Sequence, residues 1–572
     1  KEWETDHPEL MSFGVNGRMN LNVLKRFADG TYYEDFFVEK TLWALEDYGF
    51  AGLHVSDFFC PPEHGICNGD FSADMLGQFV DHTGIQLPQD ILDRLGFDEQ
   101  EDIERRQDYI WNQLRREWID FYAWRWEKFW GKIAKKLHAH GKKVMINNAW
   151  CADPFEALYR YGIDYKRLYA AGVDYFVAES VPEGLEMVDC TRDLFRPLML
   201  MPQLMNVFAP EGKLLTLLGV KDSTEEWDML HHAPPRLERD MYILAALYAQ
   251  QGKKLKRCLD GYMYTLGDGI TQEEWTWLRG RSAIAFSGEP EQVNAATIIW
   301  SDYALYAGLD DYIRTRRPSV QETVCRLQQM GGALGAAARI EDLDQLSGTL
   351  FVANFDLLSE DQQRSVLSYD RGPVVCTSLK ALPDWNVCLK DTKANIGMFL
   401  CARNLPLDNG QVKVLEDLIA QSALAKDLDG DPKDWIDPPF FVTPMLFAQM
   451  SEGFKKACVK LLDMTGVSIF HSEQGILTMK LTSGAYRVYV FNPRNNYLRA
   501  QVDCDKRVLK VENVSVFPLM PCKLLAKVTT SAKGDGAKAH LMQVEDPNAA
   551  ATGFIGRVQP CGVSIFDVTV EE

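Results

Sequence analysis

Carboxylic acids follow two apolar segments of this chain, at points where they could take part in catalysis. The run 173–180, VDYFVAES, contains Glu179 near its end. The run 213–222, KLLTLLGVKD, ends in Asp222, and Glu226 follows in the next loop. Such runs are typical of buried parallel strands, whose C-terminal ends carry the catalytic residues of barrel enzymes. Two carboxyl groups placed there could act as a general acid and as a nucleophile or base, or they could only cap or solvate loops.

Strand-like and helix-like segments alternate up to about residue 288, and they would position these acids. Strand-like runs fall at 12–20, 51–56, 143–150, 173–180, 213–222 and 257–265, with helical patterns between them. This alternation predicts an α/β fold, and we expect a (β/α)8 TIM barrel over residues 1–290. Two of its eight strands are less clear and are expected within 60–101 and near 196–204. An open doubly wound sheet is the alternative.

The later part of the chain predicts two further domains. Strand-like runs at 295–301, 348–354 and 373–377, with a helical pattern at 359–369, predict a flavodoxin-like α/β domain over residues 291–465. Short strands separated by turn residues predict a small C-terminal β-sandwich over residues 466–572. The Asp- and Pro-rich stretch 426–445 is expected to be a linker or surface loop.

Composition and charge exclude several classes of partner. The chain is 46% apolar and 25% charged, which is ordinary for a globular protein. Its net charge of -20 argues against binding to nucleic acid or to anionic membrane surfaces, whereas a neutral substrate is unaffected. No run reaches the roughly 18–20 apolar residues that span a bilayer. The first residues do not resemble a signal peptide, so we expect a cytoplasmic protein.

The cysteines predict free thiols and no metal site. There are 13 of them, scattered along the chain. Cys60 and Cys67 flank a PPEHGI stretch, but their spacing differs from the tight C-x-x-C pattern of zinc sites. No glycine-rich nucleotide-binding motif follows an early strand, and we expect no cofactor.

Three stretches resemble family-42 β-galactosidases and their relatives. They are LDGYMYTLG at 259–267, AATIIWSDYA at 295–304 and GFIGRVQPCGVSIFDV at 553–568. The resemblance implies a catalytic (β/α)8 barrel, a flavodoxin-like domain that forms a trimer, and a small β-sandwich. It also implies a homo-oligomer, with an oligosaccharide or glycoside as substrate.

The resemblance implies an exo-acting glycoside hydrolase that cleaves a terminal sugar, with a β-galactoside as the family-level expectation. The acid/base of that family follows an Asn, whereas here Ala178 precedes Glu179. The family's nucleophile is a Glu at the end of the seventh strand, where this chain has Asp222. Glycoside hydrolysis requires two carboxyl groups. We therefore expect Glu179 as the acid and Asp222 as its partner, with Glu226 as the alternative partner.

Sugar recognition needs polar groups and an aromatic face near the carboxyl pair. Side chains of these kinds lie at or near predicted strand ends, namely Asp57, Asn148, Trp150, Trp227 and Tyr262. We expect them to bind the substrate, although each tryptophan could instead pack in the core.

Two other functions fit the same architecture. One is a non-catalytic carbohydrate-binding protein, because the Asn-Glu pair is absent. The other is a glycoside phosphorylase, for which Arg18, Lys221 and Arg257 could supply a phosphate site.

Overall fold

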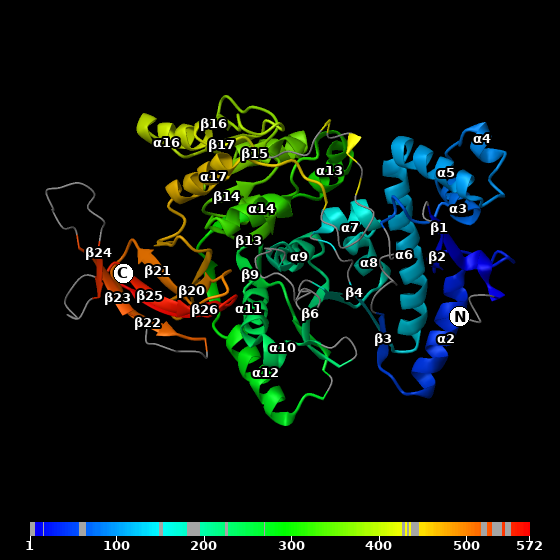
Figure 1. Cartoon of the computed structure of the whole chain (residues 1–572), viewed down its shortest axis with the longest axis horizontal. Helices are drawn as coiled ribbons and strands as arrows, with labels where there is room; N and C mark the ends of the chain where they lie inside the picture. The colour runs from blue at the N-terminus through cyan, green and yellow to red at the C-terminus, as the bar shows by residue number, and fades with distance from the viewer. Residues whose placement is uncertain are drawn as a thin grey trace.

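The structure is a computed structural model, and the molecule is elongated, with the N-terminal and C-terminal parts at opposite ends (Figure 1). It describes residues 6–14, 17–55, 65–147, 151, 153–179, 195–223, 227–267, 269–425, 430–431, 434–435, 437, 445–515, 523–528, 540–543 and 551–572.

A parallel sheet of five strands forms the centre of the N-terminal half. In spatial order its strands are β10 (Gly261–Leu266), β6 (Lys213–Asp222), β5 (Tyr175–Ala178), β4 (Lys143–Asn147) and β3 (Gly52–Val55). From β3 to β10, each successive strand of this sheet joins on the same side, as in a TIM barrel, whereas a doubly wound sheet reverses direction. The alternative of a doubly wound sheet in this region is therefore wrong.

Three segments expected to be barrel strands have other structures. The segment 12–20 forms an antiparallel hairpin of β1 (Met11–Gly14) and β2 (Gly17–Leu21). The apolar segment near 196–204 lies in helix α9 (Phe195–Phe208). In the described part of 60–101 the chain is helical in α3 (Ala73–Thr83) and α4 (Gln89–Leu92). The sheet of the described residues is thus a curled parallel sheet with β7 (Trp227–Asp228) added antiparallel to β6.

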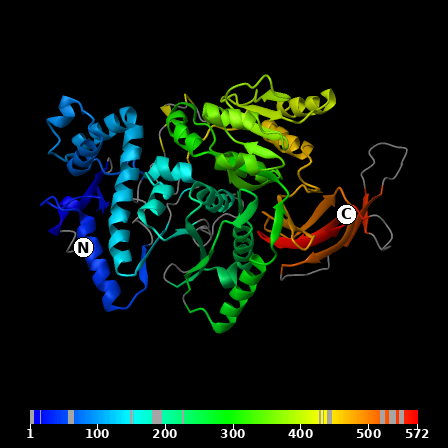
Figure 2. The same ribbon diagram turned by 180° about the vertical axis from the view of Figure 1, so that it is seen from behind.

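Helices cover this sheet, and their ends follow the local sequence (Figure 2). The helical stretch between β4 and β5 is broken by Gly162, which adopts φ 63° at the C-terminus of the first piece. Asp153 and Asp164 cap the two pieces. The helices of this half are α2 (Tyr33–Asp47), α5 (Gln100–Gln113), α6 (Arg115–Ala139), α7 (Pro154–Tyr161), α8 (Tyr165–Ala171), α10 (Met229–His232), α11 (Pro234–Ala245) and α12 (Gln272–Ala285).

The tryptophan-rich helix α6 is a packing element. Trp118, Trp126 and Trp130 are all buried, and Trp118 stacks on Phe71. Because no face of these indoles reaches solvent, they cannot form an open platform for a sugar ring.

A buried ion pair joins α6 to α2. Arg125 donates from Nη2 to Glu34 Oε2 at 2.7 Å, and both side chains are at most 3% exposed. Arg125 also donates to Gln78 Oε1 and to the Leu24 carbonyl, so its guanidinium is well satisfied. A second bridge between the same helices, Lys136 to Glu39, lies at the surface.

The second sheet has eight strands and reverses direction at β12. Its order is β16-β17-β15-β14-β12-β13-β8-β9, and the part β13-β12-β14-β15 is the parallel order 2-1-3-4 of doubly wound sheets. The hairpin β8–β9 brings residues before 290 into this sheet. The strands are β8 (Tyr248–Gln251), β9 (Lys254–Arg257), β12 (Ala296–Trp300), β13 (Leu334–Arg339), β14 (Leu350–Val352), β15 (Val374–Ser378), β16 (Val387–Lys390) and β17 (Phe399–Arg403).

Asp437 connects a helix beside the second sheet to two helices of the N-terminal half. This side chain accepts hydrogen bonds from Trp111 Nε1 at 3.0 Å, Tyr159 Oη at 3.0 Å and Arg316 Nη1 at 2.5 Å. A residue of the expected linker therefore connects α5, α7 and the end of α13. The helices are α13 (Asp302–Thr315), α14 (Val320–Gln329), α15 (Glu360–Leu367), α16 (Asn409–Ala420) and α17 (Glu452–Met464).

Two five-stranded antiparallel sheets form the C-terminal part. They share one core, in which Val488 and Val568 of one sheet meet Val502 and Phe554 of the other. The first sheet is β11 (Pro290–Val293), β19 (Ile476–Leu481), β20 (Tyr486–Phe491), β26 (Val563–Val570) and β22 (Val508–Asn513); the second is β18 (Phe470–His471), β21 (Leu498–Cys504), β25 (Gly553–Val558), β23 (Lys523–Val528) and β24 (His540–Gln543).

The division into three domains remains a prediction. Among the helices of the described residues, none is both long enough and apolar enough to cross a bilayer.

Replacing Glu34 tests the buried pair. Glu34→Gln leaves the Arg125 charge buried without its counter-ion, and we expect the free energy of unfolding to fall by about 3–5 kcal/mol. The matched control Glu39→Gln breaks the surface bridge and should cost less than about 1 kcal/mol. Urea denaturation measures both, and equal losses in the two variants would contradict this role for Glu34.

Candidate functional site

A chain of hydrogen bonds crosses the C-terminal ends of three neighbouring strands. His54 of β3 contacts Asn147 of β4, with 2.8 Å between Nε2 and Oδ1. Asn147 in turn donates from Nδ2 to Oε1 of Glu179, the residue that follows β5. Because an amide oxygen can only accept, His54 carries a proton on Nε2 in this arrangement. The carboxylate predicted from the sequence thus has an oriented donor that the sequence analysis did not identify.

Strand register explains why these three side chains meet. His54 pairs with Met145 and Asn147 pairs with Val177, so all four side chains lie on one face of the sheet. Glu179 is two residues beyond Val177, which returns it to that face. The opposite face carries Tyr262, whose side chain points to the helices. The hydrogen-bonded chain therefore lies on the face of the sheet that the helices α11 and α12 do not cover.

A β-bulge brings Asp222 to the same face. Leu217 and Gly219 lie on the Glu179 face of β6, by the register between β5 and β6. A register shift between Gly219 and Lys221 then moves Lys221 to the opposite face, opposite Leu266. Asp222, the next residue, is therefore on the Glu179 face, and its side chain is 3% exposed.

Asp222 nevertheless lies further than Glu179 in the direction of the C-terminal ends of the strands. Ala178 pairs with Thr216, which places Glu179 level with Leu217. Asp222 is then displaced by about 13–16 Å along β6, at roughly 3.3 Å per residue. Asp222 itself pairs with Trp227, the first residue of β7. Such a backbone offset is larger than the roughly 5 Å between the carboxyl groups of a retaining pair and also larger than the roughly 6.5–9.5 Å of an inverting pair.

Tyr262 is engaged within the protein. Its hydroxyl donates to the Met241 carbonyl, and its ring packs against Phe286. Burial raises the pKa of its phenol well above the usual value. These contacts give Tyr262 a packing role, and a sugar contact by this side chain has no support here.

The other expected site residues fall in parts of the chain that are not described. Asp57, Asn148, Trp150 and Glu226 lie outside the described residues. The backbone of Trp227 is described in β7, but its side chain is not.

The residues suggested for a phosphate site have other partners. Lys221 lies 3.8 Å from Asp228, and Arg257 stacks over the rings of Tyr248 and Phe286. The side chain of Arg18 is not described. Neither described cation is placed to supply a dedicated phosphate site.

A buried carboxyl group lies behind the strand ends. Asp153 caps α7 by accepting from the Glu156 amide at 2.8 Å, and it is 2% exposed. Burial raises its pKa to about 7, and the negative charge of Glu156 contributes to the rise. The nearby Cys151 and Cys67 are buried thiols, and burial raises the pKa of Cys67 to about 12. Cys60, its suggested metal partner, lies outside the described residues, and no cluster of metal-ligating side chains occurs within them.

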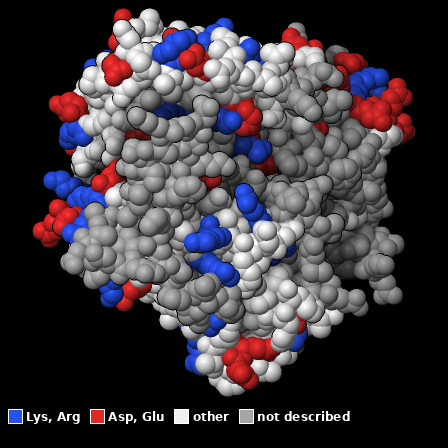
Figure 3. Space-filling model, turned by 60° about the vertical axis from the view of Figure 1, so that its left-hand side comes forward, with Lys and Arg blue, Asp and Glu red and all other residues white. Residues whose placement is uncertain are grey.

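The surface charge is unevenly spread. On the face shown in Figure 3, acidic side chains lie mostly around the margin and some basic side chains gather near the middle. The described acidic side chains therefore form no single acidic surface on this face.

Comparison with solved structures places this architecture among known folds. The chain matches a β-galactosidase from the psychrophilic Marinomonas ef1 with a TM-score of 0.50 and 11% identity, over 99% of this chain and 88% of that one. The chain resembles the GH42 β-galactosidases in fold. A β-galactosidase from Bacillus circulans sp. alkalophilus follows at TM-score 0.48 and 10% identity, covering 99% and 87% of the two chains. A GH42 β-galactosidase from G. stearothermophilus follows at 0.44 and 10%, covering 99% and 86%.

The sequence itself has no such matches. No family model matches it, and no curated protein resembles it significantly. The likeness to GH42 structures therefore concerns the TIM-barrel-like α/β fold alone.

The raised pKa of Asp153 predicts a specific pH dependence of stability. The folded protein favours the protonated carboxyl, so this group stabilises the fold below its ordinary pKa of 3.8. That contribution is lost as pH rises towards about 7, at up to about 1.4 kcal/mol per pH unit. Asp153→Asn keeps the helix cap and should remove this pH dependence, so that the variant is the more stable protein at pH 8.

Denaturant unfolding at several pH values measures this effect. Asp153→Ala is the matched variant: it should lose the same pH dependence and also about 1 kcal/mol at every pH, because the cap is lost. An unchanged slope between pH 4 and 7 in Asp153→Asn would contradict the assignment.

Proposed function

We propose that this chain is a glycoside hydrolase that removes a terminal sugar, with a β-galactoside as the first substrate to test. The observation that carries the proposal is the oriented carboxylate of Glu179 at the C-terminal edge of the parallel sheet, held by Asn147. This edge is where barrel enzymes place their catalytic groups. The β-galactosidase from Marinomonas ef1, which shares the fold, suggests the substrate class.

In this proposal Glu179 donates a proton to the leaving-group oxygen. Asn147 holds Oε1, so the donated proton would be carried on Oε2. Asp222 is the proposed second carboxyl group, acting as a base on water, and Glu226 remains the alternative. The backbone offset of Asp222 along β6 exceeds the roughly 6.5–9.5 Å of an inverting pair as well as the roughly 5 Å of a retaining pair, so it does not decide between the two mechanisms.

Substrates with different leaving groups test the role of Glu179. A general acid matters most when the leaving oxygen is strongly basic. We expect Glu179→Gln to lower kcat/KM on lactose by about 10²- to 10⁴-fold. On 2,4-dinitrophenyl β-galactoside, whose leaving group needs no proton, the loss should be much smaller.

The control for this experiment is Asp174→Asn. Asp174 lies just before β5, at the opposite end of the same strand, where it binds Lys143 and His138. This variant should lose stability and keep its turnover at a temperature where it is folded. Full activity of Glu179→Gln on lactose would show that the site is elsewhere.

The same assay separates the two alternative functions. A phosphorylase would turn over aryl glycosides faster when inorganic phosphate is added and would release a sugar phosphate. A carbohydrate-binding protein would bind sugars without turnover. Phosphate-independent release of the free sugar is the outcome that this proposal predicts.

The hydrogen-bonded chain predicts that Asn147 positions Glu179. Asn147→Ala should lower kcat/KM by about 10- to 100-fold, the usual worth of a hydrogen bond to a charged group. The alkaline limb of the pH–rate profile should also move to higher pH, because the variant lacks a donor that favours the ionised carboxylate.

Variants of His54 provide the matched pair. His54→Gln can still donate to Asn147 Oδ1 and should retain most activity. His54→Leu cannot donate, and it should show the same changes in kcat/KM and in the pH–rate profile as Asn147→Ala, but smaller. A purely structural role would lower stability without moving the pH profile.

A further inference from the structure

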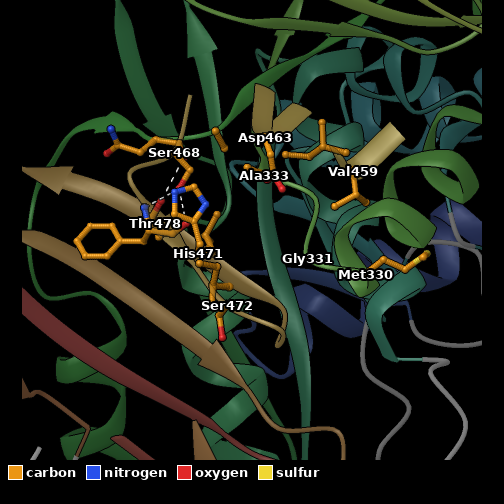
Figure 4. A pocket seen from close by; sticks show the side chains of 15 residues that line it. Met330, Gly331, Ala333, Val459, Asp463, Ser468, His471, Ser472 and Thr478 are labelled. Carbon is orange, nitrogen blue, oxygen red and sulfur yellow. Dashed lines mark hydrogen bonds between the residues drawn. The ribbon is translucent and has the colours of Figure 1, made fainter. Parts of the chain in front are cut away.

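A cavity of about 200 Å³ lies where the second sheet, helix α17 and the C-terminal sheets meet (Figure 4). None of its lining residues belongs to the parallel sheet. Its walls come from the turn after α14, the start of β13, the two residues before β12, the second half of α17 and the loop after it, and strands β18 and β19. The residues that matter for its chemistry are Asn294, Ala333, Asp463, Ser468, His471 and Ser472.

Asp463 is the charged group of this cavity. It comes from the last turn of α17, while His471 comes from β18 on another wall (Figure 4). Within the described residues the Asp463 carboxylate accepts no hydrogen bond and forms no ion pair. Burial raises its pKa, and the nearby His471 opposes that rise. A half-buried carboxylate without a donor is costly, so a ligand with donors would stabilise it.

Two serines and Asn294 of the walls also present acceptors. Ser468 donates its hydroxyl proton to the Phe470 carbonyl, and Ser472 donates its own to the Gln501 carbonyl. Each hydroxyl oxygen also accepts a backbone N–H at 3.2 Å, from Phe470 and Gln474 respectively, which leaves one lone pair on each oxygen to accept from a ligand. The side-chain oxygen of Asn294, which also lines the cavity, is buried without a hydrogen-bond partner. The walls are therefore matched to a ligand rich in hydrogen-bond donors.

Size and apolar lining narrow the ligand further. The volume is below the roughly 300–1,000 Å³ of pockets for drug-sized ligands, so the cavity holds one small molecule. Met330, Val459, Ile476 and Leu477 supply apolar surface beside the acceptors. A sugar ring has this combination, with hydroxyl donors at its edge and C–H groups on its face.

We propose that this cavity binds one neutral monosaccharide, with adjacent hydroxyls donating to the Asp463 carboxylate. The site is separate from the strand-end residues, and the proposal does not depend on hydrolase activity. It assigns to the junction of the second sheet and the C-terminal sheets a sugar-binding role of its own.

Titration of the full chain with D-galactose and with D-glucose, followed by ligand-detected NMR, tests this proposal. Asp463→Asn keeps the shape of the side chain and removes its charge, and it should weaken binding by about 10- to 100-fold. Ala333→Leu fills the cavity and should abolish binding there. Glu452→Gln, at the exposed start of the same helix, is the matched control and should bind like the unmodified chain.

The Glu179→Gln variant separates this site from the proposed catalytic one. Binding that survives in Glu179→Gln and is lost in both Asp463→Asn and Ala333→Leu supports the proposal, provided that thermal unfolding shows both variants to be folded. Three outcomes would overturn it: neither sugar binds, binding is unchanged in the folded Asp463→Asn and Ala333→Leu variants, or ethanolamine displaces the sugars and binds more tightly than they do.

Discussion

The side-chain amide of Asn147 is the interaction on which the proposed chemistry depends. It accepts from His54 and donates to Glu179, so it connects the ends of three parallel strands. An amide offers a donor and an acceptor on opposite sides of one planar group, which gives the chain of hydrogen bonds a fixed direction. That direction presents an N–H group to the carboxylate.

The register of the parallel sheet is the second constraint, because it decides which side chains can meet. A shift of one residue in β4 would bring Asn148 to the Glu179 face in place of Asn147. The bulge in β6 has the same kind of effect on Asp222, which reaches this face only because one extra residue is inserted before it. The backbone hydrogen bonds of the sheet thus decide the face on which both carboxyl groups of the proposal lie.

Much of the architecture could be predicted from the sequence, since long apolar runs such as 213–222 coincide with strands. The errors have physical causes. The short apolar segment near 196–204 reads equally well as a strand or a buried helix, and it is part of α9. Glu179 could be named as a strand-end acid, but its partners His54 and Asn147 depend on pairings between strands that are distant in sequence.

The most direct test of the account is a crystal structure of Glu179→Gln with lactose bound. The account predicts the glycosidic oxygen within hydrogen-bonding distance, about 2.6–3.2 Å, of the amide introduced at position 179, with Asn147 still in contact with that side chain. It also predicts Asp222 or Glu226 on the opposite side of the sugar, with a water molecule between. Lactose bound away from the C-terminal edge of the parallel sheet would contradict the central claim.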